Sequence, residues 1–176
     1  MELSLKRPIC FFDIESTGVN VVKDRIVEIS ILKIYPNGNR ESRTWLVNPE
    51  MPIPPETTAI HGISDEKVAN EPTFKQLAHR IHDMIKDADL AGYNSNKFDI
   101  PMLAEEFLRA DQDFDFSKKR AVDVQNIFHK KEQRTLSAAY RFYCDKVLED
   151  AHTAEADTLA TYEILKSQLD RYEDLE

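Results

Sequence analysis

The chain has few of the residues that mark specialised classes of protein. Its 176 residues include only two cysteines, Cys10 and Cys144, so it lacks a disulfide framework and we expect free, buried thiols. No apolar run reaches the roughly 18 residues of a membrane span, and the first residues lack the apolar core of a signal peptide. Internal repeats and flexible linkers are also missing. These absences predict a single domain over residues 1–176, in the cytoplasm and without a membrane partner.

The balance of charge restricts the partners that the chain can take. Hydrophobic residues make up 41% and charged residues 31%, as in a soluble globular protein, but the net charge is -9. This acidity argues against a protein that binds duplex nucleic acid through a broad basic surface. It leaves open a nucleic acid bound through divalent metal ions, since the ions themselves supply the positive charge.

An apolar run near the start of the chain ends in two acids, Asp13 and Glu15. Alternate side chains of a strand point the same way, so both carboxylates are expected on one face of a buried strand. Ionised groups are costly to bury unless they are paired or bind a metal. Two interpretations remain open from this stretch alone: a strand that ends in solvent, or one side of a metal site.

The pattern of apolar residues predicts an alternation of strands and helices. Besides the first strand, strands are expected over 25–35, 40–47, 89–93 and 119–122, with a hairpin turn over 36–39. Helices are expected over 73–87, after Asp99, from Asp123 to about 131, after Thr135 and from about 152, with short helical turns near 56–64. Only four glycines occur, and each lies at an expected turn or element end.

Several polar residues lie at junctions between these elements. Asp99 could cap the helix that follows it, and Asp123 and Thr153 could cap theirs. Asp157 falls beside the apolar stripe of the last helix, where an acid is unusual. Glu28 interrupts the second strand, and an exposed position is favoured for it over a catalytic role. The basic residues 118–120, 130, 131 and 134 could follow a phosphate backbone, although solvated surface is favoured for them.

Taken in order along the chain, these acids carry a resemblance to a known family. The sequence resembles the DEDDh exonucleases, the group that contains the epsilon proofreading subunit of bacterial replicative DNA polymerases, ribonuclease T and oligoribonuclease. The matching stretches span nearly the whole chain: Phe12-Asp13-Ile14-Glu15-Ser16-Thr17-Gly18, Ile26-Val27-Glu28-Ile29, Ile60-His61-Gly62-Ile63, Gly92-Tyr93-Asn94 through Phe98-Asp99, and His152-Thr153-Ala154-Glu155-Ala156-Asp157.

The resemblance implies a fold and a set of site residues. The implied fold is α/β and ribonuclease-H-like: a five-stranded mixed sheet, with strands one to three antiparallel, flanked by α-helices. The implied metal ligands are Asp13, Glu15, Asp99 and Asp157, which would hold two divalent ions, Mg²⁺ or Mn²⁺. His152 is implied as the general base. The implied substrate contacts are Thr17, Gly18, His61, Asn94 and Phe98.

One stretch departs from the family pattern. Tyr93 stands where family members often have histidine, and the stretch to Asp99 is one residue longer. Either Asn94 or Asn96 could therefore take the place of the family's asparagine.

The activity implied by the resemblance is a metal-dependent 3′→5′ exonuclease that releases nucleoside 5′-monophosphates from single-stranded ends. DNA, in proofreading or repair, is the expected substrate. Three alternatives stay open: an RNA 3′-end trimming enzyme, a non-autonomous accessory subunit of a DNA polymerase, and a catalytically inactive binder of nucleotide ends. The last is disfavoured because all five catalytic positions hold the expected residues. The sequence does not indicate an oligomeric state.

Overall fold

The computed structural model describes residues 1–175 and divides into two compact units. The first unit comprises Met1–Asn126, and the second begins at Ile127. Helix α5, Val124–Lys131, contains the boundary. The expectation of a single domain remains a prediction.

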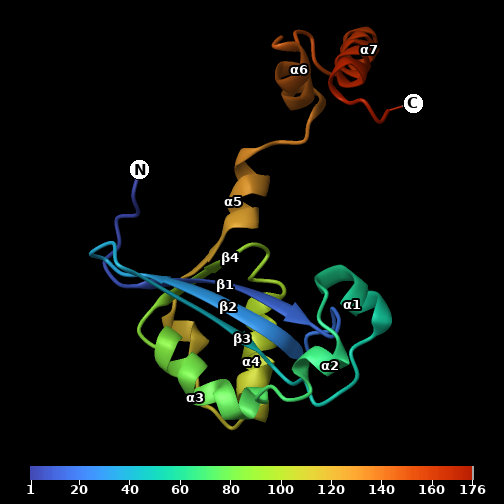
Figure 1. Ribbon diagram of the computed structural model, residues 1–176. Helices are drawn as coiled ribbons and strands as arrows, with labels where there is room; N and C mark the ends of the chain where they lie inside the picture. The colour runs from blue at the N-terminus through green and yellow to red at the C-terminus, as the bar shows by residue number, and fades with distance from the viewer. Residues whose placement is uncertain (176) are drawn as a thin grey trace. The chain divides into compact units, whose positions relative to one another are not determined.

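A five-stranded sheet forms the centre of the first unit (Figure 1). The strands are β1 (Ile9–Ser16), β2 (Ile26–Ile34), β3 (Arg40–Leu46), β4 (Asp89–Gly92) and β5 (Ala121–Asp123), in the order β3-β2-β1-β4-β5. β1, β2 and β3 pair antiparallel, whereas β4 runs parallel to both β1 and β5. The expected mixed sheet is therefore confirmed, and β1 has a neighbour on each side.

Alternation along β1 fixes which side chains enter the core. Phe12 and Ile14 are buried, Asp13 is exposed and Glu15 is half-buried. In the register with β2, Phe12 lies opposite Ile31 and Ile14 opposite Ile29, so these apolar pairs face the same side. A one-residue slip would bury Asp13 and expose Phe12, so the core determines the orientation of the acids.

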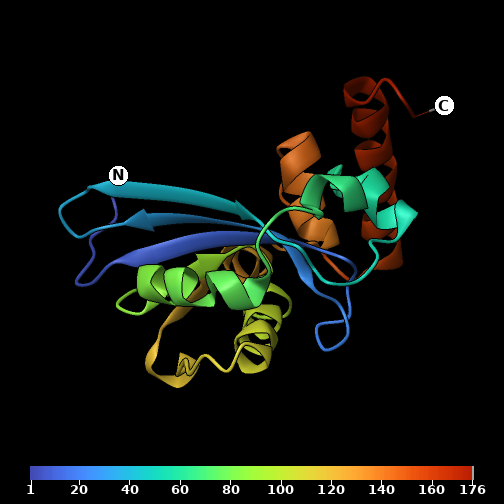
Figure 2. The ribbon, with the colours of Figure 1, turned by 60° about the horizontal axis from the view of Figure 1, so that its bottom comes forward.

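Two helices cover the apolar face of the sheet, α3 (Phe74–Ile85) and α4 (Asp99–Arg109) (Figures 1 and 2). α3 begins with the expected capping box, in which Thr73 and Gln76 exchange hydrogen bonds. Two short helices, α1 (Pro55–His61) and α2 (Asp65–Val68), accompany a smaller core cluster of Val27, Ile53, Ile63 and Val68. A 3-10 helix follows at Phe116–Lys118.

The second unit is a pair of helices, α6 (Leu136–Cys144) and α7 (Ala154–Arg171). Tyr140 of α6 packs against Ala160 and Ile164 of α7. The Tyr140 hydroxyl donates to Glu163 Oε2 at 2.5 Å, so the buried ring has a partner for its polar end.

Both cysteines are free, as expected, but only Cys10 is buried, and Cys144 is half-buried. Burial raises the pKa of the Cys10 thiol to about 12, so the thiol stays protonated at neutral pH. Among the helices of residues 1–175, none is long and apolar enough to cross a membrane.

Two lysines satisfy the carbonyl groups where α3 ends. Lys33 is buried and its Nζ donates to Met84 O at 2.8 Å and to Asp87 Oδ1 at 2.6 Å. Lys119 Nζ donates to the carbonyl oxygens of Ile85, Lys86 and Ala88, at 2.7, 2.9 and 2.6 Å. The last carbonyls of a helix carry partial negative charge and have no intrahelical partner, so a cation stabilises them.

Replacing Lys119 by methionine is expected to lower the free energy of unfolding by about 1–3 kcal/mol, because three carbonyl groups lose a charged donor. Urea unfolding followed by circular dichroism measures this change. Lys118→Met is the matched control, since the neighbouring Lys118 is exposed and its only ion pair in residues 1–175 is a 3.8 Å contact with Asp115. Equal midpoints for the two variants would contradict the assignment.

Candidate active site

The two acids of β1 lie on the face of the sheet opposite the core. Asp13 lies across from Ser30 in β2, and Glu15 across from Glu28. Burial raises the pKa of Glu15, the neighbouring Asp13 and Glu28 raise it further, and His61 opposes the shift. Glu28, which the sequence places at an exposed position, is half-buried and adds a third carboxylate to this face. The like charges make this a place where a cation would be stabilising.

Asp99 is buried and is bonded directly to the strand that carries these acids. It is the first residue of α4, is 4% exposed, and its Oδ1 accepts a hydrogen bond from Ile14 N at 3.2 Å. The N-cap of α4 is Phe98, and no side chain makes a capping bond there. The expectation that Asp99 caps its helix is therefore wrong. Because Ile14 lies between Asp13 and Glu15 in the chain, the bond joins Asp99 to the segment that carries both acids.

The electrostatics of Asp99 reflect this position. Burial and the neighbouring Asp13 raise the pKa of Asp99 to about 6, and the hydrogen bond from Ile14 opposes the shift. A buried carboxylate next to a second carboxylate is costly unless a cation neutralises it.

The donor set of this face fits hard divalent cations. Asp13, Glu15 and Asp99 offer only oxygen atoms, which Mg²⁺ and Mn²⁺ prefer over nitrogen or sulfur. Within residues 1–175, no group of three or more acidic, histidine or cysteine side chains is arranged to hold an ion by itself. The set of four ligands that the resemblance implies therefore stays a prediction.

His152 and Asp157 belong to the second unit, where they are bonded to each other across the start of α7. His152 N donates to Asp157 Oδ1 at 3.3 Å, and the exposed His152 adopts a φ of 74°. Thr153 occupies the N-cap position, but its hydroxyl donates to Asp150 O at 2.9 Å and makes no cap bond. Thr153 is therefore the N-cap residue of α7, as expected, although its side chain makes no capping bond. The backbone before α7 instead depends on the Asp157 carboxylate.

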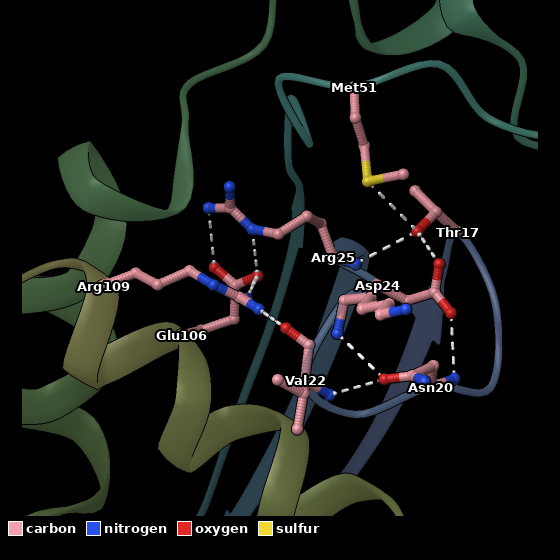
Figure 3. A network of polar contacts seen from close by, with 9 residues as sticks. Thr17, Asn20, Val22, Asp24, Arg25, Met51, Glu106 and Arg109 are labelled. Atoms are coloured by element: carbon pink, nitrogen blue, oxygen red, sulfur yellow. Dashed lines mark hydrogen bonds and ion pairs between the residues drawn. The ribbon is translucent and has the colours of Figure 1, made fainter.

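The segment after β1 begins with Thr17 and Gly18, and Thr17 is bonded to several residues of the following loop (Figure 3). The Thr17 hydroxyl donates to Asp24 Oδ1 at 2.9 Å and accepts from Arg25 N at 3.0 Å. Thr17 N donates to Arg25 O, and Thr17 O accepts from Thr57, so both backbone groups of Thr17 have partners. A Cβ at residue 18 would lie 2.5 Å from the Asp24 carboxylate, which explains the glycine. Contact of Thr17 and Gly18 with a substrate stays a prediction.

A buried ion-pair network joins this turn to α4 (Figure 3). Glu106 is 1% exposed, and its Oε1 accepts from Arg25 Nε at 2.6 Å and from Arg109 Nη1 at 3.1 Å. Arg109 also donates to Val22 O. The hydrogen bond to Glu106 raises the pKa of Arg25. The network holds the C-terminal part of α4 against the loop that follows Gly18, and a buried charge of this kind needs such partners.

His61, an expected substrate contact, is tied to the end of β1. Its Nδ1 accepts from Ile63 N at 3.1 Å, so in the neutral ring the proton lies on Nε2, which is 3.0 Å from Ser16 O. Both ring nitrogens therefore have partners in the protein, and a role for His61 toward a nucleotide would use the face of its ring.

The loop between β4 and α4 is fixed by Asp123, at the end of β5. Asp123 is 4% exposed and accepts from Asn94 N at 2.9 Å and Asn96 N at 3.1 Å. It also accepts from Gln125 N and Asn126 N, so the expected cap of α5 is confirmed. Asn94 has a φ of 61°, a conformation that asparagine tolerates better than most residues. Asn94 and Asn96 are thus held by one carboxylate.

The candidate residues of this loop divide between core and surface. Phe98 is half-buried against the main core, and Asn94 is half-buried while Asn96 is exposed. Their contacts with a substrate stay predictions, and so does the choice between Asn94 and Asn96.

Sequence reasoning missed the supporting roles of Asp24, Glu106 and Asp123. The capping position of Asp123 was visible in the sequence, but its bonds to Asn94 and Asn96 cross 29 and 27 residues. Glu106 falls on an otherwise apolar helix face, and an acid in that position was the available signal for a buried ion pair.

Comparisons with known proteins identify a family and a fold for this chain. A model of the family described as Exonuclease matches residues 10–165. The solved structure of E. coli exonuclease I in complex with an oligonucleotide matches 94% of the chain and 42% of its own, with a TM-score of 0.64 and 19% identity. The fold is therefore ribonuclease-H-like, as expected.

The chain belongs to the exonuclease family, because the family model covers most of its length. A DNA polymerase III subunit epsilon-like protein of Rhodobacter capsulatus is 35% identical over 158 residues, which is 86% of this chain and 22% of that protein. The DNA polymerase III subunit epsilon of Treponema pallidum is 33% identical over 95 residues, 54% of this chain and 44% of its own. The chain thus spans less than half the length of these relatives. The expected DEDDh exonuclease family is confirmed.

Replacing Asp123 by asparagine is expected to lower the free energy of unfolding at pH 7 by about 1–3 kcal/mol, because an amide cannot accept all four backbone bonds. Burial would raise the pKa of Asp123, but those bonds outweigh burial and lower it. The stabilisation is therefore full above the ordinary pKa and is lost as the pH falls through the lower folded value.

Urea unfolding between pH 7 and pH 3 checks this prediction. The difference between wild type and Asp123→Asn should shrink as the pH falls below about 4. Asp113→Asn, at an exposed position, is the matched control and should leave stability unchanged at every pH. A constant difference for Asp123→Asn across this range would contradict the role of its charge.

Proposed function

We propose that this chain is a metal-dependent 3′→5′ exonuclease that removes nucleoside 5′-monophosphates from the 3′ end of single-stranded DNA. The observation that carries the proposal is the bond between buried Asp99 and the Asp13–Glu15 strand, in a chain of the exonuclease family. Relatives named as epsilon and epsilon-like subunits of DNA polymerase III support DNA as the substrate and a DNA polymerase as a partner.

Asp13, Glu15, Asp99 and Asp157 would hold two Mg²⁺ or Mn²⁺ ions. When bound, such ions supply positive charge that stabilises the attacking and leaving oxygens of an in-line displacement at phosphorus. Burial and the neighbouring Asp13 raise the pKa values of Glu15 and Asp99, which supports these two first-unit ligands because buried, mutually repelling carboxylates gain from a cation.

His152 would act as the general base. Its imidazole would take a proton from the attacking water as the water oxygen forms a bond to phosphorus and the bond to the 3′ oxygen breaks. The leaving 3′ oxygen takes up a proton from solvent. The products are a nucleoside 5′-monophosphate and a strand one nucleotide shorter with a free 3′ hydroxyl. The bond to Asp157 uses the backbone nitrogen of His152, so this contact does not occupy the imidazole nitrogens that the transfer needs.

The proposal is tested with 5′-labelled single-stranded DNA and RNA oligonucleotides, incubated with Mg²⁺, Mn²⁺ or EDTA. A ladder that shortens from the 3′ end in either metal, and is absent in EDTA, is expected. Asp157→Ala should lose this activity, whereas Asp113→Asn should keep it. A preference for RNA would reassign the substrate to RNA 3′-end trimming. Absence of shortening in both metals, or full activity of Asp157→Ala, would contradict the proposal.

Replacing His152 by alanine is expected to lower kcat by about 10²–10⁴-fold, the usual contribution of a general base. The metal ligands remain, so Mg²⁺ or Mn²⁺ should raise the melting temperature of the variant as it does for wild type. His79→Ala, at an exposed position on α3, is the control for loss of a histidine. An unchanged kcat for His152→Ala would remove it from the mechanism, and loss of the metal-induced stabilisation would assign it to metal binding.

A further inference from the structure

The second unit contains a groove that the proposed chemistry does not use. The groove lies between the end of α5 and helix α6 and has a volume of about 1180 Å³. Its lining includes two exposed aromatic rings, Phe128 and Phe142, which are 46% and 62% exposed. We call it the α5–α6 groove.

Positive charge gathers along this groove. Lys131, Arg134, Arg141 and Lys146 line it, with Glu132 as the single acid of the lining. Residues 127–148 hold five lysines and arginines against two acids, a net charge of +3 in a chain whose net charge is -9.

Most of these cations have no counter-ion in the protein. Lys146 pairs with Glu163 at 3.1 Å, but none of the ion pairs among residues 1–175 involves Lys131, Arg134 or Arg141. These three side chains are exposed. A polyanion would therefore meet cations whose charge is not already neutralised.

The aromatic rings indicate which polyanion fits. The Arg171 guanidinium lies 4.7 Å from the centroid of the Phe142 ring, which supports the ring from α7 and adds a further cation. Exposed aromatic rings between cations are the usual platform for unpaired bases, which stack on the rings while the cations follow the phosphates. A duplex hides the faces of its bases, so the rings favour a single strand.

We propose that the α5–α6 groove binds single-stranded nucleic acid on the 5′ side of the end that is cleaved. This inference rests on the proposed exonuclease function. Phe142 and Phe128 would stack on bases, and Lys131, Arg134 and Arg141 would contact phosphates. Of the basic residues for which solvated surface is favoured from the sequence, only Lys131 and Arg134 line the groove.

Binding is measured by fluorescence anisotropy with a labelled 16-nucleotide oligothymidylate in EDTA, which prevents cleavage. The triple variant Lys131→Glu, Arg134→Glu, Arg141→Glu should bind at least about tenfold more weakly than wild type at low salt. The plot of log Kd against log salt concentration should become less steep by about two for this variant. Each phosphate contact to a single strand contributes about 0.7 to the slope, and three contacts are lost. Phe142→Ala should bind the oligonucleotide at least about fivefold more weakly than wild type, because a base loses its stacking partner.

The matched control reverses three exposed charges in the first unit, Arg40→Glu, Lys75→Glu and Arg80→Glu. It changes the net charge equally and should bind the oligonucleotide within about threefold of wild type. Thermal melting followed by circular dichroism checks that each variant is folded.

A small substrate separates this inference from the proposed function. The p-nitrophenyl ester of thymidine 5′-monophosphate has one phosphate and no strand on its 5′ side, so it lacks the part of the substrate that the groove is proposed to bind. The triple groove variant should hydrolyse it with wild-type kcat and KM but lose at least about tenfold in kcat/KM on the 16-nucleotide strand. If wild type hydrolyses neither substrate, the proposed exonuclease function fails. The anisotropy measurements then test by themselves whether the groove binds single-stranded nucleic acid.

Two results would overturn the groove proposal. One is binding and cleavage of the 16-nucleotide strand by the groove variants at the level of the control variant. The other is a wild-type dimer in sedimentation that the groove variants dissociate, since the groove would then be the contact with a second copy of the chain.

Discussion

The hydrogen bond from Ile14 N to the Asp99 carboxylate is the contact on which the organisation of the first unit depends. It joins the central strand β1 to the first residue of α4 across 85 residues of sequence. The apolar neighbours make the bond possible, because Phe12 and Ile14 face the core and Met102, Leu103 and Phe107 hold α4 against them. A buried carboxylate is costly without a partner, and the Ile14 N–H supplies one for Asp99. The packing of the core therefore determines where the acids lie.

The supporting contacts hold the segments on either side of that bond. Glu106 and its two arginines fix the other end of α4 to the loop after Gly18. Asp123 fixes the loop between β4 and α4. Each is a buried or nearly buried acid with several donors, the arrangement in which a charge inside a protein is least costly. The rigidity of the acid-bearing face thus derives from acids that do not belong to the expected metal-binding set.

Much of the fold could be predicted from the sequence, because its signals are local. Apolar runs predicted β1 and β2, the turn at 36–39 predicted the hairpin, and Thr73 with Gln76 predicted the start of α3. The role of Asp99 could not be predicted in this way, because an acid before a helix looks like a cap and only the tertiary fold brings Ile14 N within reach. The same limit applies to Asp123, whose partners lie in an earlier loop. The candidate ligands came from resemblance to a family. A family pattern indicates which residues far apart in the sequence act together, and local patterns do not.

In the second unit, the spacing of apolar residues predicts a helix but not how that helix packs. One apolar stripe predicted α7, and Ala160 and Ile164 of that stripe are indeed buried against α6. The helix also exposes Leu159, Tyr162, Leu165 and Leu169, so its apolar residues are not confined to one face. A helix of this kind has a weak amphipathic signal, and its packing cannot be deduced from periodicity alone. The family match, which extends from residue 10 to residue 165, nevertheless includes residues of both units.

The distribution of charge bears on how an acidic protein can act on a polyanion. A net charge of -9 repels phosphate at long range, and the acids Asp13, Glu15 and Asp99 would strengthen that repulsion where cleavage is proposed. Divalent ions at the proposed ligands would reverse the local charge only at the bond to be cleaved, since their effect is strongest at their own ligands. The remainder of the strand would need attraction from other residues, and Lys131, Arg134 and Arg141 of the α5–α6 groove would supply it. Lysine or arginine among the acids would compete with the metal ions for the same oxygens, so cations outside the acidic cluster are the better source of this attraction.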